Sequence, residues 1–312
     1  MITKVSTKDM SREEWLEKRR LSIGGSDAGT LLGFNPYNSP YSLWCEKTGK
    51  ITPEDISDKE AVRIGNDLEQ YAADRFTEKT GKKLRKANYI YYNSEYPFAH
   101  ANVDRDVVGE NAGFEAKTTS SWEILQQCRE GKYPDMWYAQ MTHYMMVRGY
   151  ERYYLGVLVL GKGFFDFTIE RNEAEIRALA SAEESFWSRV RSNTPPALDG
   201  TEATQDALKT VLGDSRAGQG ADLSGVGNHV IMYSALKERM KEMEAELNEH
   251  QAMIMQYMGS AEKGTYANAT VSFKTQTRKT FDRKRFEAAN GPIADIYFNE
   301  STSRPFKVTV KK

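Results

Sequence analysis

Two acidic residues and a lysine have the types and spacing to act on a phosphate ester: Asp104, and after it the run Glu115-Ala116-Lys117. Side chains two apart in a β-strand point to the same face, so Glu115 and Lys117 would emerge side by side. Asp104 ends the preceding predicted strand and would face them across a hairpin. Two carboxylates and a backbone carbonyl, that of Ala116, suit Mg²⁺ or Mn²⁺. Such a metal lowers the pKa of a bound water, while Lys117 would position that water or stabilise developing negative charge.

The same pattern has a plainer interpretation. In a chain in which 28% of the residues are charged, a hairpin with a solvated outer face can produce it by chance. The flanking residues favour the functional interpretation, because Val103 precedes Asp104 and Gly113-Phe114 precede Glu115, as at strand ends that leave a core.

Two further polar residues lie on predicted helices. Glu69 adjoins the apolar stripe of the helix predicted over residues 58–80, and Gln140 shares a helix face with Met136 and Tyr144. Either side chain suits a catalytic site. Each is also what an ordinary helix boundary or surface supplies, so the residues alone leave both interpretations open.

The elements that must position these residues are strands with helices before, between and after them. Apolar and β-branched runs predict strands at Tyr89–Tyr92, Phe98–Val103, Gly113–Thr118, Tyr153–Leu160 and Phe164–Ile169. Helical spacing and capping residues predict helices at 11–22, from Ser26 to Gly33, before Thr48-Gly49, and at 58–80, 122–129, 135–147 and 173–192. This order predicts an α/β fold with a central sheet flanked by helices.

The last third of the chain has a different character. Residues 195–228 are rich in Gly, Asp, Ala and Thr, and the stretch is predicted to be a linker. We divide the chain into a core of residues 1–210, a linker of residues 211–229 and an extension of residues 230–312. The extension is predicted to hold a helix at 230–258, a strand at 269–275, a helix at 282–290 and a strand at 305–310.

The predicted helix at 230–258 carries apolar residues four and three apart, which is a heptad stripe. Its members are Leu236, Met240, Met243, Leu247, His250, Ile254 and Tyr257. Because the stripe spans only about three heptads, we expect a helical hairpin or a docked helix rather than a free coiled coil.

Charge is unevenly distributed along the chain. From Ser272 to Lys312 there are ten Lys or Arg and four Asp or Glu, so this tail carries +6 and the preceding residues carry −7. A basic tail on an acidic body is typical of a segment that binds a polyanion, although a solvated basic surface has the same composition. We expect the tail to add affinity for duplex DNA.

Composition argues against several classes of site. Cys45 and Cys128 are too few for a disulfide framework or an iron–sulfur cluster, and four scattered histidines do not have the spacing of a structural zinc site. No apolar run approaches the ~20 residues of a membrane span. The N-terminus has no apolar signal core, so we expect no membrane association and a cytoplasmic protein.

The order of motifs resembles that of the YqaJ-type viral recombinases, phage exonucleases akin to the lambda exonuclease. The opening motif is Arg19-Arg20-x-x-Ile23-Gly24-Gly25-Ser26-Asp27, Leu32-Gly33-x-x-Pro36-Tyr37 and Leu43-Trp44-x-x-Lys47-Thr48-Gly49. The later motifs are Gly65-x-x-x-Glu69, Asp104, Glu115-Ala116-Lys117 and Tyr138-x-Gln140-x-x-x-Tyr144-Met145. One departure stands out, because Val103-Asp104-Arg105 replaces the Pro-Asp-Gly of many members. The resemblance covers about residues 11–210.

The resemblance implies a restriction-endonuclease-like core, with a central mixed sheet flanked by helices, followed by a C-terminal helical and small α+β extension. It also implies two-metal hydrolysis and a role for each site residue. Asp104 and Glu115 would be metal ligands together with the Ala116 carbonyl, and Glu69 would lie in or beside the metal site. Lys117 would act at the nucleophile, and Gln140 would orient water or substrate. Arg19 and Ser26 would bind a DNA 5′ phosphate, and Tyr144 would contribute to substrate binding.

The activity implied is that of a Mg²⁺- or Mn²⁺-dependent exonuclease that degrades linear double-stranded DNA from 5′ to 3′ for phage recombination. The partners implied are DNA ends, a single-strand annealing protein and further copies of the chain in a ring-like homo-oligomer, in the cytoplasm of a bacterial host. Two alternatives stay open: a structure- or site-specific endonuclease on the same core, and a non-catalytic DNA-binding module.

Overall fold

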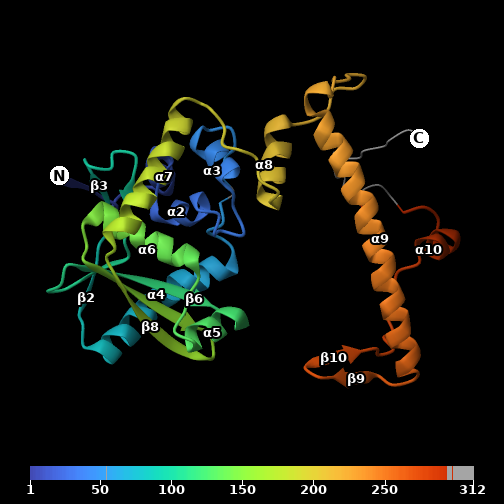
Figure 1. Cartoon of the computed structure of the whole chain (residues 1–312). Coiled ribbons are helices and arrows are strands. Elements are labelled where there is room, and N and C mark those ends of the chain that lie inside the picture. Colours follow the sequence, from blue (N-terminus) through green and yellow to red (C-terminus); the bar gives the residue numbers. More distant parts are fainter. Residues whose placement is uncertain (54, 294–296, 298–312) are drawn as a thin grey trace. The chain divides into compact units, whose positions relative to one another are not determined.

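The structure is a computed structural model that describes residues 1–53, 55–293 and 297. Its internal contacts divide the chain into two compact units, Met1–Gly213 and Asp214–Lys312. Figure 1 shows a mixed α/β arrangement in the first unit and one long helix in the second. All the predicted site residues belong to the first unit.

The first unit is built on a five-stranded mixed sheet. Its strands, in spatial order, are β2 (Leu84–Lys86), β5 (Arg105–Val107), β6 (Ala112–Thr119), β7 (Arg152–Val159) and β8 (Gly163–Glu170). β6 and β7 run parallel, and the other neighbours run antiparallel. The expected α/β class with a central mixed sheet is therefore confirmed.

The two faces of β6 are buried against different helices. Phe114 faces α4 (Glu60–Thr80), where its ring centroid lies 4.8 Å from that of Phe76. Because side chains alternate along a strand, the neighbouring Glu115 points to the opposite face. On that face α6 (Asp135–Arg148) covers the sheet, with Tyr144 and Tyr153 packed at a ring-centroid distance of 5.5 Å.

Helix α6 is held on several sides, and most of its residues are buried. It packs against α2 (Gly25–Leu31) and α7 (Glu173–Arg191). His143 Nε2 donates to the His100 carbonyl at 2.8 Å, and His143 Nδ1 contacts Glu183 Oε1 at 2.7 Å. The Val147 carbonyl accepts from the side-chain amide of Asn93 at 3.3 Å.

Smaller elements complete the first unit. A second sheet holds β1 (Ile2–Ser6), β3 (Tyr89–Asn93) and β4 (His100–Ala101), with β3 in the middle. The remaining helices are α1 (Arg12–Arg20), α3 (Pro40–Lys47), α5 (Trp122–Arg129) and α8 (Glu202–Leu212).

The structure departs from the expected elements in several places. The strand expected at Phe98–Val103 shrinks to β4, and Asp104 precedes β5 rather than ending a strand. The short strands β1, β2 and β5 were not expected, since runs of three to five residues leave little alternation to detect. Residues 195–228 are not linker throughout, because α8 packs on α3 and Thr204 Oγ1 donates to Ser39 Oγ at 2.7 Å.

The second unit consists of α9 (Gly227–Met258), preceded by a short 3₁₀ turn at Ser224–Val226, and a small tail. The tail holds the hairpin β9 (Lys263–Tyr266) and β10 (Ala269–Ser272), then α10 (Arg283–Asn290). The expected strand at Pro305–Val310 lies outside the described residues, as do Arg304, Lys307, Lys311 and Lys312 of the basic tail. The role of this tail in DNA affinity stays a prediction.

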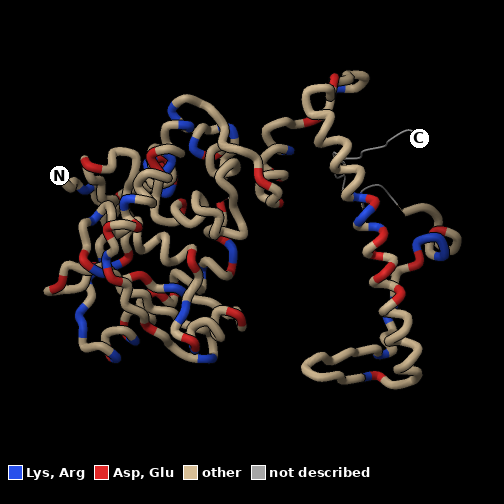
Figure 2. The backbone as a smooth tube through the Cα atoms, viewed as in Figure 1, with Lys and Arg blue, Asp and Glu red and all other residues tan. Residues whose placement is uncertain are grey.

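The heptad stripe of α9 is exposed along its length, and no described residue of this helix is buried. Near its C-terminal end, Val271 and Phe273 line a hollow together with Leu247 and Ile254. The charges of α9 gather in its middle, as Figure 2 shows, which leaves both ends of the helix without Lys, Arg, Asp or Glu. The docked helix expected from the sequence is therefore not seen among the described residues of this unit.

Gly113 on β6 provides a test of how closely the sheet is packed. A Cβ at this position would lie 2.4 Å from Cε2 of Tyr153, a fully buried ring. We expect Gly113→Ala to destabilise the protein by about 1–3 kcal/mol, as overpacking of a core does. Urea unfolding measures this change.

The matched control is Gly65→Ala on α4, where an added Cβ meets nothing within 4 Å. It should leave stability unchanged or raise it by about 0.5–1 kcal/mol, because alanine favours a helix interior over glycine. Equal effects of the two substitutions would contradict the packing argument.

Candidate active site

Glu115, Lys117 and Gln140 form one hydrogen-bonded cluster between β6 and α6. Lys117 Nζ lies 2.7 Å from Glu115 Oε1 and 2.9 Å from Gln140 Oε1. Gln140 Nε2 donates to Glu115 Oε1 at 2.9 Å, which closes the ring of contacts. The structure thus brings Gln140 of α6 to Glu115 and Lys117, which lie two residues apart on β6.

Tyr144 lies one helical turn after Gln140, and its hydroxyl accepts from Gln140 Nε2 at 2.9 Å. Its ring is buried against Gly25 of α2, where an added Cβ would come within 2.5 Å of Tyr144 Cε1. Both N–H groups of the Gln140 amide are therefore engaged, and its oxygen faces Lys117. For Tyr144, expected to contribute to substrate binding, this burial favours a role in orienting Gln140.

Asp104 reaches the same cluster from the start of β5. Its Oδ2 accepts from the backbone N–H of Ala116 at 3.1 Å, so the carboxylate lies beside β6. Burial and the neighbouring Glu115 carboxylate raise the pKa of Asp104 well above its ordinary value, and Lys117 only partly opposes them. The carboxylates of this site therefore repel one another more strongly than Lys117 compensates.

Glu69 is held at the edge of the cluster by Arg105. Arg105 Nη2 donates to Glu69 Oε1 at 2.7 Å, and Lys86 Nζ lies 4.0 Å from the same oxygen. Arg105 is itself buried, and its Nε has no hydrogen-bond partner among the described residues. The sequence singled out Arg105 only as a departure from the family's Pro-Asp-Gly, and nothing in its neighbours indicated this ion pair.

The donor set fits a hard divalent cation. Glu115 Oε2 is buried and has no hydrogen-bond partner in the part of the chain that the structure describes, which leaves one carboxylate oxygen available beside Asp104. Carboxylate and carbonyl oxygens are the ligands that Mg²⁺ and Mn²⁺ prefer. Within the described part of the chain, no three His, Cys, Asp or Glu side chains converge as a metal-binding group. A metal at this site would therefore depend on two carboxylates and a backbone carbonyl.

Arg19 and Ser26, for which binding of a 5′ phosphate is expected, lie next to one another. Arg19 Nη2 donates to Ser26 Oγ at 2.8 Å, and the guanidinium carbon lies 4.4 Å from the ring centroid of Trp15. Stacking on an aromatic ring and one hydrogen bond fix the guanidinium, and its other N–H groups can donate to an anion.

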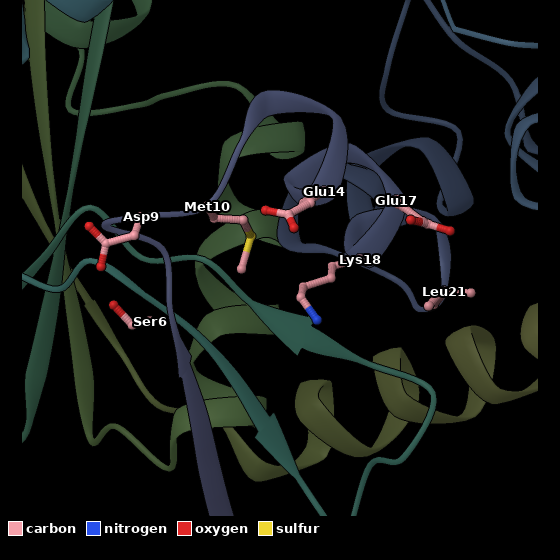
Figure 3. A pocket seen from close by; sticks show the side chains of 7 residues that line it. All are labelled: Ser6, Asp9, Met10, Glu14, Glu17, Lys18 and Leu21. Atoms are coloured by element: carbon pink, nitrogen blue, oxygen red, sulfur yellow. The ribbon is translucent and has the colours of Figure 1, made fainter.

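A separate hollow lies between the end of β1 and α1, and Figure 3 shows its lining. Its side chains are Ser6, Asp9, Met10, Glu14, Glu17, Lys18 and Leu21. None of these residues belongs to the predicted site. Glu14 already has a structural role, because its carboxylate accepts from the Ser11 N–H in a capping box.

The chain is similar to one known protein family. Residues 14–151 match the model of the YqaJ-like viral recombinase domain. The uncharacterized protein YqaJ of Bacillus subtilis (strain 168) is 36% identical over 293 residues, which cover 93% of this chain and 90% of that protein. The chain belongs to the YqaJ family. The matched domain contains Arg19, Glu69, Asp104, Glu115 and Gln140.

Solved structures extend the comparison to the fold. The alkaline exonuclease LHK-Exo from Laribacter hongkongensis is similar to this YqaJ-family chain, at 18% sequence identity. Its complex with dAMP gives a TM-score of 0.51 over 58% of this chain and 94% of that chain, and a second crystal structure gives 0.49. The shared fold is the restriction-endonuclease-like fold that the motifs implied. Among the described residues, no helix has the length and apolar composition to cross a membrane.

The two aspartates on either side of Arg105 lead to opposite predictions. A raised pKa means that folding disfavours the charged form, so at pH 7 the Asp104 carboxylate costs the metal-free protein stability. Asp104→Asn keeps an acceptor for the Ala116 N–H and removes that charge. We expect it to raise the thermal unfolding midpoint in EDTA.

Asp106 is the matched comparison. Burial alone would raise its pKa, but the Tyr150 hydroxyl and Arg148 outweigh burial and lower it. Its charge therefore stabilises the fold at pH 7, and Asp106→Asn should cost about 1–3 kcal/mol. A lower unfolding midpoint for Asp104→Asn would contradict our account of the site's electrostatics.

Proposed function

We propose that this YqaJ-family protein is a metal-dependent nuclease that degrades linear double-stranded DNA from the 5′ end. The observation that carries the proposal is the cluster of Glu115, Lys117 and Gln140 beside Asp104. An exonuclease with the same fold, LHK-Exo, supports it.

Asp104, Glu115 and the Ala116 carbonyl would hold Mg²⁺ or Mn²⁺. When bound, the metal would lower the pKa of a water molecule and offset charge on the scissile phosphate. Glu115 Oε2, which has no hydrogen-bond partner in the described part of the chain, and the mutual repulsion of the carboxylates favour this assignment.

The side chains of the chain itself would position the reactants. Lys117 would place its ammonium where negative charge develops on the phosphate, since it lies in a partly buried site where electrostatic interactions are strong. Gln140, fixed by Tyr144, would hold Lys117 and Glu115 in register and orient the attacking water. Glu69, paired with Arg105, would lie beside the metal site.

Arg19 and Ser26 would bind the terminal 5′ phosphate. A guanidinium and a hydroxyl 2.8 Å apart form a compact donor pair, and a charged donor gives the stronger hydrogen bonds to a phosphate. Recognition of the end by this pair is what would give the enzyme its 5′→3′ direction.

The setting follows from the family, whose name is that of viral recombinases. The single strand that such degradation leaves would pass to a single-strand annealing protein in phage recombination. Further copies of the chain would form a ring-like homo-oligomer on the duplex, in the cytoplasm of a bacterial host.

One assay separates the proposal from its alternatives. Linear duplex and covalently closed circular duplex are incubated with the protein in Mg²⁺ and in EDTA. Loss of the linear form alone, in Mg²⁺ alone, is the expected result. Nicked or cut circles would indicate an endonuclease, and intact DNA in both cases would indicate a binding module.

We expect Asp104→Asn and Glu115→Gln to lower the cleavage rate at least about 100-fold, because each removes a charged metal ligand and keeps its shape. Asp106→Asn is the control, since Asp106 binds Tyr150 and Arg148 instead of the cluster. Circular dichroism checks that each variant is folded. Full activity of Asp104→Asn would refute the metal assignment.

We expect a duplex with 5′ phosphates to be degraded about tenfold or more faster than one with 5′ hydroxyls. This ratio corresponds to the free energy of one charged hydrogen bond. Arg19→Ala should erase the difference. The control is Arg12→Ala, since Arg12 contacts the same Trp15 ring, whereas it is Arg19 that donates to Ser26. Equal degradation rates of the two duplexes by the unmodified protein would refute the proposed 5′-phosphate pocket.

A further inference from the structure

Lys47 is a buried lysine that belongs to none of the groups placed in the active site. It is the last residue of α3, and its side chain is 7% exposed. Its ammonium lies 2.7 Å from Asp27 Oδ2, 2.9 Å from the Arg19 carbonyl and 2.8 Å from the Ser22 carbonyl. An ammonium has three N–H donors, so these acceptors use all of them.

The three acceptors lie on one short segment, residues 19–27. The Arg19 carbonyl is at the end of α1, the Ser22 carbonyl is in the turn that follows, and Asp27 is in the first turn of α2. Asp27 Oδ2 also accepts from the Gly24 N–H at 2.9 Å, which ties the turn to the helix.

The same segment carries both residues of the phosphate pocket. Arg19 and Ser26 are seven positions apart, and their side chains meet only because the chain reverses between them. Lys47 joins the two sides of this reversal, through the backbone of Arg19 and the carboxylate next to Ser26.

We infer that Lys47 is a positioning residue for recognition of the DNA 5′ phosphate: it contacts no phosphate itself and holds Arg19 and Ser26 at the separation that binds one. This inference rests on the proposed function, because it assigns Lys47 to the pocket proposed there.

Charge balance agrees with this geometry. Burial alone would raise the pKa of Asp27, but Lys47 and then Arg19 outweigh burial and lower it. Asp27 is therefore an anion that Lys47 and Arg19 share, so loss of Lys47 would leave Arg19 as its main cation. Loss of Lys47 would also remove the contacts to the Arg19 and Ser22 carbonyls, which hold the reversal between Arg19 and Ser26 whatever the charge of residue 27.

The test measures binding without cleavage, by fluorescence anisotropy in EDTA, of one short duplex with a 5′ phosphate or a 5′ hydroxyl. For the unmodified protein we expect about tenfold tighter binding of the phosphorylated duplex. Lys47→Met should reduce this ratio to nearly one, with little change for the 5′-hydroxyl duplex.

A second variant separates positioning from folding. Lys47→Met leaves the Asp27 carboxylate buried beside fewer cations, which destabilises a protein. The double variant Lys47→Met with Asp27→Asn removes that charge, so its unfolding midpoint should recover part of the loss while the binding ratio stays near one. Lys50→Met is the matched control, since Lys50 lies over the Trp44 ring and outside this network.

Each outcome decides between the pocket and the residue that positions it. If the unmodified protein and the double variant both bind the 5′-phosphorylated duplex more tightly than the 5′-hydroxyl duplex, the role of Lys47 is overturned and the proposed pocket stays intact. No preference in the unmodified protein would overturn the pocket and the role of Lys47 together. A preference lost in Lys50→Met as well would also overturn the specific role of Lys47.

Discussion

The carboxylate of Glu115 is buried, and its Oε1 accepts hydrogen bonds from Lys117 and Gln140. A buried charge is costly unless it is paired and hydrogen-bonded, so this contact constrains everything that supplies its partners. Strand β6 must present Glu115 and Lys117 on one face, and α6 must bring Gln140 to that face. The other oxygen stays without a partner among the described residues, which leaves the cluster incomplete as a structural element and suited to a cation.

Two glycines allow the helices and strands to come close enough for this contact. Gly25 lets α2 lie directly on the Tyr144 ring, and Gly113 leaves room for the Tyr153 ring over β6. The hydrogen-bonded pair of Arg19 and Ser26 is thereby tied to the cluster of Glu115, because Ser26 follows Gly25 in the chain. Recognition of a DNA end and cleavage would thus share one packed core, with little freedom to move independently.

Local pattern was enough to predict much of this site. The two-residue period of a strand placed Glu115 and Lys117 together, and helical spacing placed Gln140 on a face with Tyr144. The position of Asp104 was less predictable, because β5 has only three residues and its pairing with β6 depends on distant contacts. The Arg105–Glu69 pair and the Lys47 network could not be predicted, since each joins side chains far apart in sequence whose burial leaves no periodic signal. Helix α9 is the opposite case. Its sequence has a clear heptad pattern, but among the described residues of its unit no element buries that stripe.

Helix α6 makes its contacts in fixed directions: Gln140 toward Glu115, His143 toward His100 and Glu183, and the end of the helix toward Asn93. Inserting or deleting one residue in a helix turns everything beyond it by about 100°. A change of length between Gln140 and His143 would therefore disconnect the Gln140 amide from the histidine and the asparagine contacts at once. A change of length is better tolerated in a loop, such as the one after α8 that holds Gly213, Gly218 and Gly220.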